Sequence, residues 1–190
     1  MIFMNALKEI NSQTCPWWLI FTFDNVFRRW YHDPKSILGE YVRPGDTALD
    51  VGCGIGYFTI PLAELVGENG MVIAADLQEQ MLKGVRRRSK RSGLEGRIRC
   101  HLSQPEAIGV TEPVDFALAF WMVHEVRQPQ AFLREIYDLL KPGGRFLLVE
   151  PVFHVSETDF KLTSEKCETA GFRIIAMPKV RGSRALLLQK

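Results

Sequence analysis

Paired cysteines, long apolar runs and a strong charge imbalance are all lacking in this chain of 190 residues. Its four cysteines (Cys15, Cys53, Cys100 and Cys167) include no C-x-x-C pair, which argues against a zinc site or a disulfide framework and suits the reducing cytoplasm. The apolar patch at residues 16–23 is too short to cross a bilayer, and no basic leader precedes it, so we expect neither membrane insertion nor secretion. The net charge of +2 does not by itself imply a polyanionic partner.

Short apolar runs alternate with amphipathic segments along most of the chain. We expect a short helix opened by Asp33 and Pro34, longer helices at residues 58–66, 78–92, 131–140 and 157–170, and strands ending at residue 51 and at 71–76, 98–102, 114–120, 146–150, 172–177 and 185–189. This alternation predicts an α/β fold, a doubly wound and mainly parallel sheet covered on both faces. With 46% hydrophobic residues, the chain can bury one core, so residues 33–190 are expected to form a single domain.

The segment at residues 49–58 is a short apolar strand followed by Gly52, Gly54 and Gly56 and then by helix-forming residues. Glycines at this spacing let the backbone bend sharply and approach a ligand, while the next helix offers free N–H groups. A second apolar strand ends in Asp76, about 20 residues further on, where doubly wound folds place the carboxylate that holds ribose hydroxyls. The two features together predict a nucleotide site at the carboxyl ends of the strands.

The loop differs from a dinucleotide fingerprint, because Tyr57 stands where G-x-G-x-x-G has its third glycine and Asp50 closes the preceding strand. This pattern resembles motif I of the class I S-adenosylmethionine-dependent methyltransferases. Later segments resemble, in order, motif II, the fourth strand with its trailing segment, and the L-K-P-G-G turn; they are residues 76–82, 114–126 and 139–147. The resemblance covers roughly residues 37–190 and is strongest to small ubiquinone-biosynthesis-like or type 11 methyltransferases. It implies S-adenosylmethionine as cofactor and a Rossmann-like sheet of seven strands with a reversed terminal strand.

The resemblance also implies the residues that hold the cofactor. Asp50 is expected to attract the methionine ammonium group, and Asp76 to accept from both ribose hydroxyls, because an ionised carboxylate is acceptor-only. Leu77 is expected against one face of the adenine. The family's usual Asp after the third strand is missing, so Ser103 or Gln104 is expected to accept from the adenine amino group. The full predicted set is Asp50, Gly52, Cys53, Gly54, Gly56, Asp76, Leu77, Ser103, Gln104 and Phe120.

The methyl group on a sulfonium is already activated, so alignment of the acceptor and exclusion of water supply most of the acceleration. A base is needed only where the acceptor must lose a proton. His124 and Glu125, just past the fourth strand, are the predicted candidates, with a structural hydrogen-bonding role for His124 as the alternative. Glu150 and His154 follow the fifth strand on the same rim. The spacings of these four residues match no known metal site, so no metal is predicted.

Residues 1–32 are expected to form an aromatic lid segment outside the methyltransferase domain. Trp17, Trp18 and Trp30 are the predicted acceptor contacts, together with His154; packing over the cofactor edge is the alternative role of the tryptophans. An aromatic lid favours a small or medium acceptor that is flat or lipophilic.

Several other functions are weighed against methyl transfer to a small molecule. The basic segment at residues 83–91, with Arg97 and Arg99, is expected to be a solvated helix face, with binding to RNA or another acidic partner as the alternative. A metalloid methyltransferase needs clustered cysteines, which the chain lacks. An NAD-dependent oxidoreductase is disfavoured by the glycine spacing, and a cofactor-binding protein without transferase activity stays open. The sequence gives no prediction of the oligomeric state.

Overall fold

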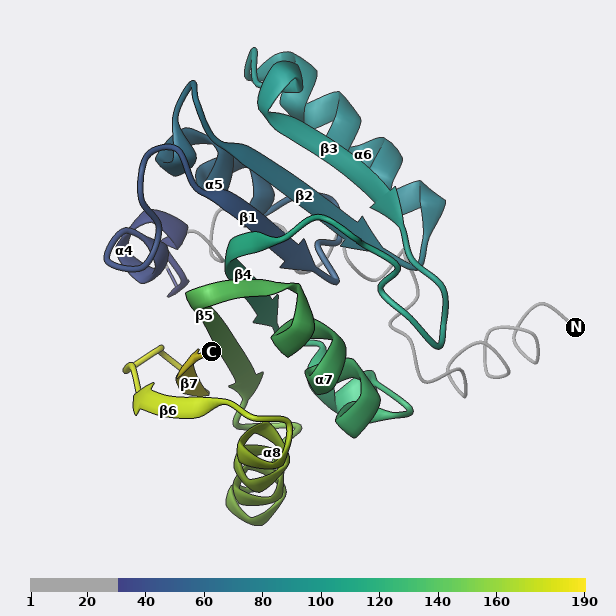
Figure 1. Cartoon of the computed structure of the whole chain (residues 1–190). Coiled ribbons are helices and arrows are strands. Elements are labelled where there is room, and N and C mark those ends of the chain that lie inside the picture. Colours follow the sequence, from purple (N-terminus) through teal and green to yellow (C-terminus); the bar gives the residue numbers. More distant parts are fainter. Residues whose placement is uncertain (1–30) are drawn as a thin grey trace, which may run out of the picture.

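The computed structural model describes residues 31–190, so Trp17, Trp18 and Trp30 of the predicted lid segment lie outside the described residues. The described strands are β1 (Thr47–Val51), β2 (Met71–Asp76), β3 (Ile98–Leu102), β4 (Val114–Phe120), β5 (Leu140–Pro151), β6 (Arg173–Ala176) and β7 (Ser183–Gln189). They form one sheet in the order β3-β2-β1-β4-β5-β7-β6 (Figure 1). The first five strands run parallel and β7 is antiparallel to both of its neighbours. The predicted sheet with a reversed terminal strand is therefore confirmed.

Helices cover both faces of the sheet (Figure 1). They are α4 (Pro34–Leu38), α5 (Thr59–Val66), α6 (Glu79–Arg91), α7 (Pro129–Leu139) and α8 (Glu157–Thr169), with short 3-10 helices η1 (Glu95–Arg97) and η2 (Val123–Glu125). Because side chains alternate along a strand, Ala48 and Leu49 of β1 enter different cores. Ala48 packs in the core of α4 and α5, and Leu49 in the core of α7 and α8. Helix α6 packs on Ala74 of β2 through Leu82 and Val85.

The central strands are buried on both faces, which explains why their sequences are continuous apolar runs rather than alternating ones. Helix α6 differs, since it buries Met81, Leu82 and Val85 and turns most of its basic residues outward. None of the helices within residues 31–190 combines the length and apolarity needed to cross a membrane.

The start of β5 is the clearest departure from the sequence prediction. The strand begins at Leu140, which pairs with Val114 of β4. The sequence instead predicts a turn at residues 141–144 and a strand that begins only at residue 146. The register shifts before Arg145 pairs with Phe116, and Gly143 has a φ of +77°. The turn residues are therefore a bulge inside the strand, because Leu140 finds a partner on β4 that no local sequence pattern encodes.

The order of the strands fixes where a ligand can bind. Connections leave β1 toward β2 and β3 on one side, and β4 and β5 lie on the other side of β1. A ligand of such a sheet binds outside the carboxyl ends of the strands at this switch point.

Candidate active site

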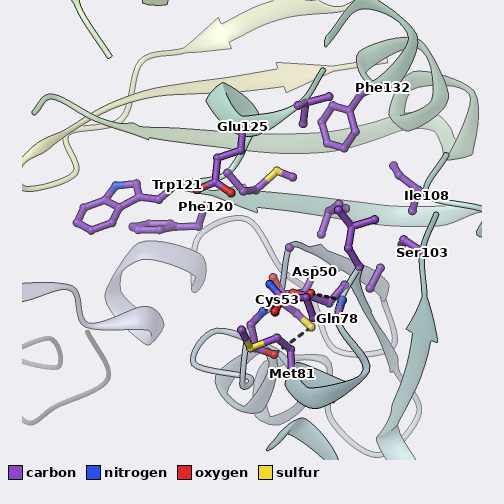
Figure 2. A pocket seen from close by; sticks show the side chains of 18 of the residues that line it. Asp50, Cys53, Gln78, Met81, Ser103, Ile108, Phe120, Trp121, Glu125 and Phe132 are labelled. Carbon is purple, nitrogen blue, oxygen red and sulfur yellow. Dashed lines mark hydrogen bonds between the residues drawn. The ribbon is translucent and has the colours of Figure 1, made fainter. Parts of the chain in front are cut away.

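A cavity of about 610 Å³ lies at the carboxyl ends of β1, β2, β4 and β5. Its volume is in the range of cofactor and ligand pockets. Figure 2 shows Ser103 and Ile108 on one side of the cavity, Phe120 and Trp121 on the other side, and Asp50 in the middle of the view. Nine of the ten predicted cofactor-binding residues line it: Asp50, Gly52, Cys53, Gly54, Asp76, Leu77, Ser103, Gln104 and Phe120.

Gly56 is the exception among the predicted cofactor residues, since it is absent from the cavity wall. It has a φ of +90°, and a Cβ added there would lie 3.3 Å from Cγ2 of Val85. Val85 belongs to α6, so Gly56 allows the loop after β1 to pack closely against that helix. The third glycine thus packs against α6 and lies outside the cavity wall.

The glycine loop lets the backbone approach the cavity but contributes few free donors. Gly52 and Gly54 have φ values of +66° and +54°, which L side chains rarely adopt. A Cβ on Gly52 would also lie 2.9 Å from Cγ of Met122. The N–H groups of Gly52 and Cys53 both donate to the carbonyl of Ala75, at 2.9 and 3.1 Å. The N–H groups of these two loop residues are therefore used within the protein, and close approach is what the glycines provide.

Asp76 connects the glycine loop to the start of α6. Its Oδ2 accepts from the N–H of Gly54 at 3.0 Å, and its Oδ1 accepts from the N–H of Gln78 at 2.9 Å. Burial raises the pKa of Asp76 above its ordinary value, against these backbone hydrogen bonds, which lower it. Each carboxylate oxygen has a second lone pair, so Asp76 can still accept from two ribose hydroxyls.

Asp50 is buried and faces helix α5. Its Oδ2 accepts from the hydroxyl of Thr59 at 2.6 Å, which joins the end of β1 to the first turn of α5. Because Asp50 also lines the cavity, its carboxyl group lies where it can accept a hydrogen bond from a ligand's ammonium group, either directly or through a water.

The opposite end of the cavity fits a purine base. Leu77 lines the cavity with 42% of its surface exposed, so a flat apolar ring can pack against it. The hydroxyl of Ser103 is buried and has no hydrogen-bond partner among the described residues. A buried hydroxyl without a partner is costly, and a base edge with donor and acceptor atoms would satisfy it. These observations fit an adenosine group at the predicted place.

The two predicted catalytic residues lie at one part of the wall together with His154, a predicted acceptor contact. His124, Glu125 and His154 all line the cavity, and the ring centres of the two histidines lie 5.7 Å apart. His124 Nε2 is 4.0 Å from Oε1 of Glu125. Among residues 31–190, no group of three His, Cys, Asp or Glu side chains is placed to hold a metal ion.

Glu150 is a buried residue of β5 that hydrogen-bonds to the backbone and the ring of His124. The glutamate is only 1% exposed, and its Oε1 accepts from the N–H groups of Val123 at 2.8 Å and His124 at 3.3 Å. Its Oε2 accepts from Nδ1 of the His124 ring. Burial of the ring lowers the pKa of His124, but the hydrogen bond and charge of Glu150 raise it more, so the net shift is upward. The bond also fixes the tautomer, because Nδ1 carries the proton and Nε2 keeps its lone pair.

An aromatic wall that the sequence analysis did not identify adjoins these histidines. Trp121 has a φ of +61°, the only positive value for a residue other than glycine within residues 31–190. Its Nε1 donates to the hydroxyl of Ser183 at 2.9 Å, and its ring meets Phe153 edge-on with centres 5.3 Å apart. Such backbone strain costs on the order of 1–2 kcal/mol and is found mainly at functional sites. The only sequence feature that could have indicated a role for Trp121 at the site is its position directly after β4.

Comparisons with known proteins agree with this geometry. The family model described as "Methyltransferase domain" matches residues 43–182. The chain is 31% identical over 157 residues to the ubiquinone/menaquinone biosynthesis C-methyltransferase UbiE of Marinomonas sp. (strain MWYL1), covering 82% of this chain and 60% of that protein. It is 36% identical over 110 residues to the protein of the same name from Escherichia coli O1:K1, covering 57% and 44% respectively. The chain thus spans about half the length of these relatives.

A solved structure is similar over nearly the whole of both chains. It is the crystal structure of an S-adenosylmethionine-dependent methyltransferase from Aquifex aeolicus, with a TM-score of 0.81 and 27% sequence identity. The match covers 93% of this chain and 99% of that one.

Proposed function

Since the chain belongs to the methyltransferase domain family, the class I S-adenosylmethionine-dependent methyltransferases, we propose that it methylates a small or medium acceptor that is flat and lipophilic. The relatives named C-methyltransferases support carbon as the atom that is methylated. One observation carries the proposal: a single cavity joins the glycine loop and Asp76 to the histidine–glutamate pair of His124 and Glu150.

The cofactor would be held along the wall formed by the ends of β1 and β2. Asp76 would bind the ribose hydroxyls, Asp50 would attract the ammonium group, and Ser103 or Gln104 would contact the adenine edge. When bound there, S-adenosylmethionine supplies an activated methyl group on a sulfonium.

His124 acts as the general base in this proposal. His124 lines the cavity, and in the neutral ring Nε2 keeps its lone pair because Nδ1 donates to Glu150, so the ring can take a proton from the acceptor. The buried carboxylate of Glu150 orients the ring and stabilises the imidazolium that results, as acidic partners of catalytic histidines do. Loss of that proton is what methylation at an aromatic carbon requires, while transfer to a neutral amine requires no base.

The acceptor would lie between the histidines and the aromatic wall of Trp121 and Phe153. Phe153 is 61% exposed, a large apolar surface that a lipophilic ring would cover. We also propose that Trp17, Trp18 and Trp30 complete the acceptor site as a lid, and that the protein works in the cytoplasm without a nucleic-acid partner. The free thiols of Cys53, Cys100 and Cys167 support a reducing compartment.

The acceptor class is tested by transfer of a labelled methyl group to a hydroquinone that carries an apolar tail and one unsubstituted ring carbon. The matched control is the same compound with that carbon already methylated. Label on the ring of the first compound alone supports C-methylation of a lipophilic ring. Label on oxygen in both compounds would contradict the proposed acceptor atom.

Removal of residues 1–30 is expected to leave binding of S-adenosylhomocysteine intact and to abolish methyl transfer. The lid excludes water and aligns the acceptor, so its loss affects the reaction and not the cofactor wall.

The cut is placed before Tyr31 because His32 is 1% exposed and packs against Phe120 and Trp121, so it belongs to the domain core. The measurements are calorimetric binding and the rate of label transfer. Full transfer by the truncated protein would exclude the lid role, and a variant with Ala at Trp17, Trp18 and Trp30 separates the aromatic rings from the rest of the segment.

A further inference from the structure

The segment between β3 and β4 forms the end of the cavity where the adenine base is proposed to bind. Ser103, Gln104 and Ile108 line it, and Figure 2 shows Ser103 and Ile108 on the same side. Apart from an isolated bridge between Gln104 and Ala107, the segment contains no regular helix or strand. Its shape therefore depends on a few specific hydrogen bonds.

Glu135, on the neighbouring helix α7, makes two of these hydrogen bonds. Its Oε2 accepts from the N–H of Ile108 at 2.9 Å and its Oε1 accepts from the N–H of Gly109 at 2.8 Å. One carboxylate thus holds two successive backbone N–H groups. Bonds from N–H groups to an ionised acceptor are stronger than those between neutral groups.

A second bond holds the same point of the loop from the side of the sheet. Nε2 of His101, on β3, lies 2.8 Å from the carbonyl oxygen of Ile108. Because a carbonyl oxygen only accepts, Nε2 carries the proton. Gly109 has a φ of +76°, so the chain turns sharply where the two anchors meet. Ile108 is consequently held from both α7 and β3.

The contacts of Glu135 differ from those of another acid on the same helix. Asp138 forms an exposed pair with Arg134, the kind of surface contact that contributes little. Glu135 has no ion pair among the described residues. Both of its carboxylate oxygens accept hydrogen bonds from the loop, and its side chain also lines the cavity.

We propose that Glu135 is a positioning residue for recognition of the adenine base. It fixes Ile108 and the loop, so that the apolar side chain of Ile108 and the unpartnered hydroxyl of Ser103 face the base in a set geometry. The identity of the ligand rests on the proposed function, whereas the two hydrogen bonds of Glu135 do not. The residue acts through the loop and takes no part in the transfer step.

The test is calorimetric binding of S-adenosylhomocysteine to the full chain and to three variants. Glu135→Ala is expected to raise Kd about 10- to 100-fold, the scale of losing hydrogen bonds to a charged group. Glu135→Gln keeps the size and one acceptor oxygen, so its Kd is expected between those of wild type and Glu135→Ala, and it serves if the Ala variant does not fold. Asp138→Asn, on the same helix, is expected to bind like wild type.

Base selectivity separates positioning from general loss of stability. Kd is measured for S-adenosylhomocysteine and for S-inosylhomocysteine, which differ at the base alone. A mere loss of folded protein would weaken both ligands equally, whereas loss of loop position is expected to reduce the preference for adenine. Unchanged affinity and selectivity in both Glu135 variants would overturn the inference. A wild-type protein that binds neither ligand would overturn the proposed function itself, and the inference with it.

Discussion

Replacing His124 by Asn is expected to lower the rate of methyl transfer about 10²- to 10⁴-fold, the usual contribution of a general base. Asn can hydrogen-bond but cannot take a proton near neutral pH, and it is close to the imidazole in size. Affinity for S-adenosylhomocysteine is expected to stay unchanged, because the predicted cofactor contacts are other residues of the cavity wall. An unchanged rate would return His124 to a structural role.

The pH profile gives a second readout of the same pair. The active imidazole is neutral, so the rate is expected to rise with pH through the pKa of His124, which lies above its ordinary value. Glu150→Gln removes the charge that raises this pKa and leaves the effect of burial, which lowers it. The midpoint of the profile is therefore expected at lower pH in Glu150→Gln than in wild type. A midpoint that does not move would show that Glu150 does not control the base.

Replacing Asp76 by Ala is expected to weaken binding of S-adenosylhomocysteine by about 1.5–3 kcal/mol, the scale of hydrogen bonds to a charged group. That corresponds to a Kd about 10- to 150-fold higher. The variant loses the acceptors for the ribose hydroxyls and also the bond that Asp76 Oδ2 accepts from Gly54 of the glycine loop.

Two controls make the Asp76 result specific. Asp76→Asn keeps one acceptor oxygen at the same place, so its loss of affinity is expected to be smaller. NAD is expected to leave the melting temperature of wild type unchanged while S-adenosylhomocysteine raises it, since a ligand that binds only the native state stabilises it by mass action. Stabilisation by NAD alone would contradict the identification of the cofactor.

Most of the fold could be predicted because the sequence carries it locally. The strands Val114–Phe120 and Ile98–Leu102 have the same bounds as the strands predicted from the sequence. The start of β5 could not be predicted, because Leu140 pairs with Val114 of β4, a strand distant in the sequence. The local L-K-P-G-G pattern predicts only the end of a helix and a turn.

Residues of the site could be predicted where a polar or charged residue stands at or just after the carboxyl end of a predicted strand. Asp76 ends β2, and Ser103 and His124 follow β3 and β4. The carboxyl ends of these strands meet at one edge of the sheet, so the three residues were expected together, and all line the cavity. The pairing of Glu150 with the His124 ring joins residues 26 positions apart, and only the adjacency of β4 and β5 reveals it. The strained backbone of Trp121 and the hydrogen bonds of Glu135 to the loop are tertiary features with no sequence pattern of their own.

The proposed reaction in this cavity is transfer of a methyl group from S-adenosylmethionine to a small lipophilic acceptor. In the most direct measurement, the purified chain of residues 1–190 is incubated with S-adenosylmethionine carrying a labelled methyl group and with a cell extract, and the products are analysed by mass spectrometry. The expected products are a labelled small molecule that is soluble in organic solvent and an equal amount of S-adenosylhomocysteine, and both are expected to be lost with His124→Asn. Label found in RNA or protein instead, or cofactor binding with no labelled product at all, would contradict it.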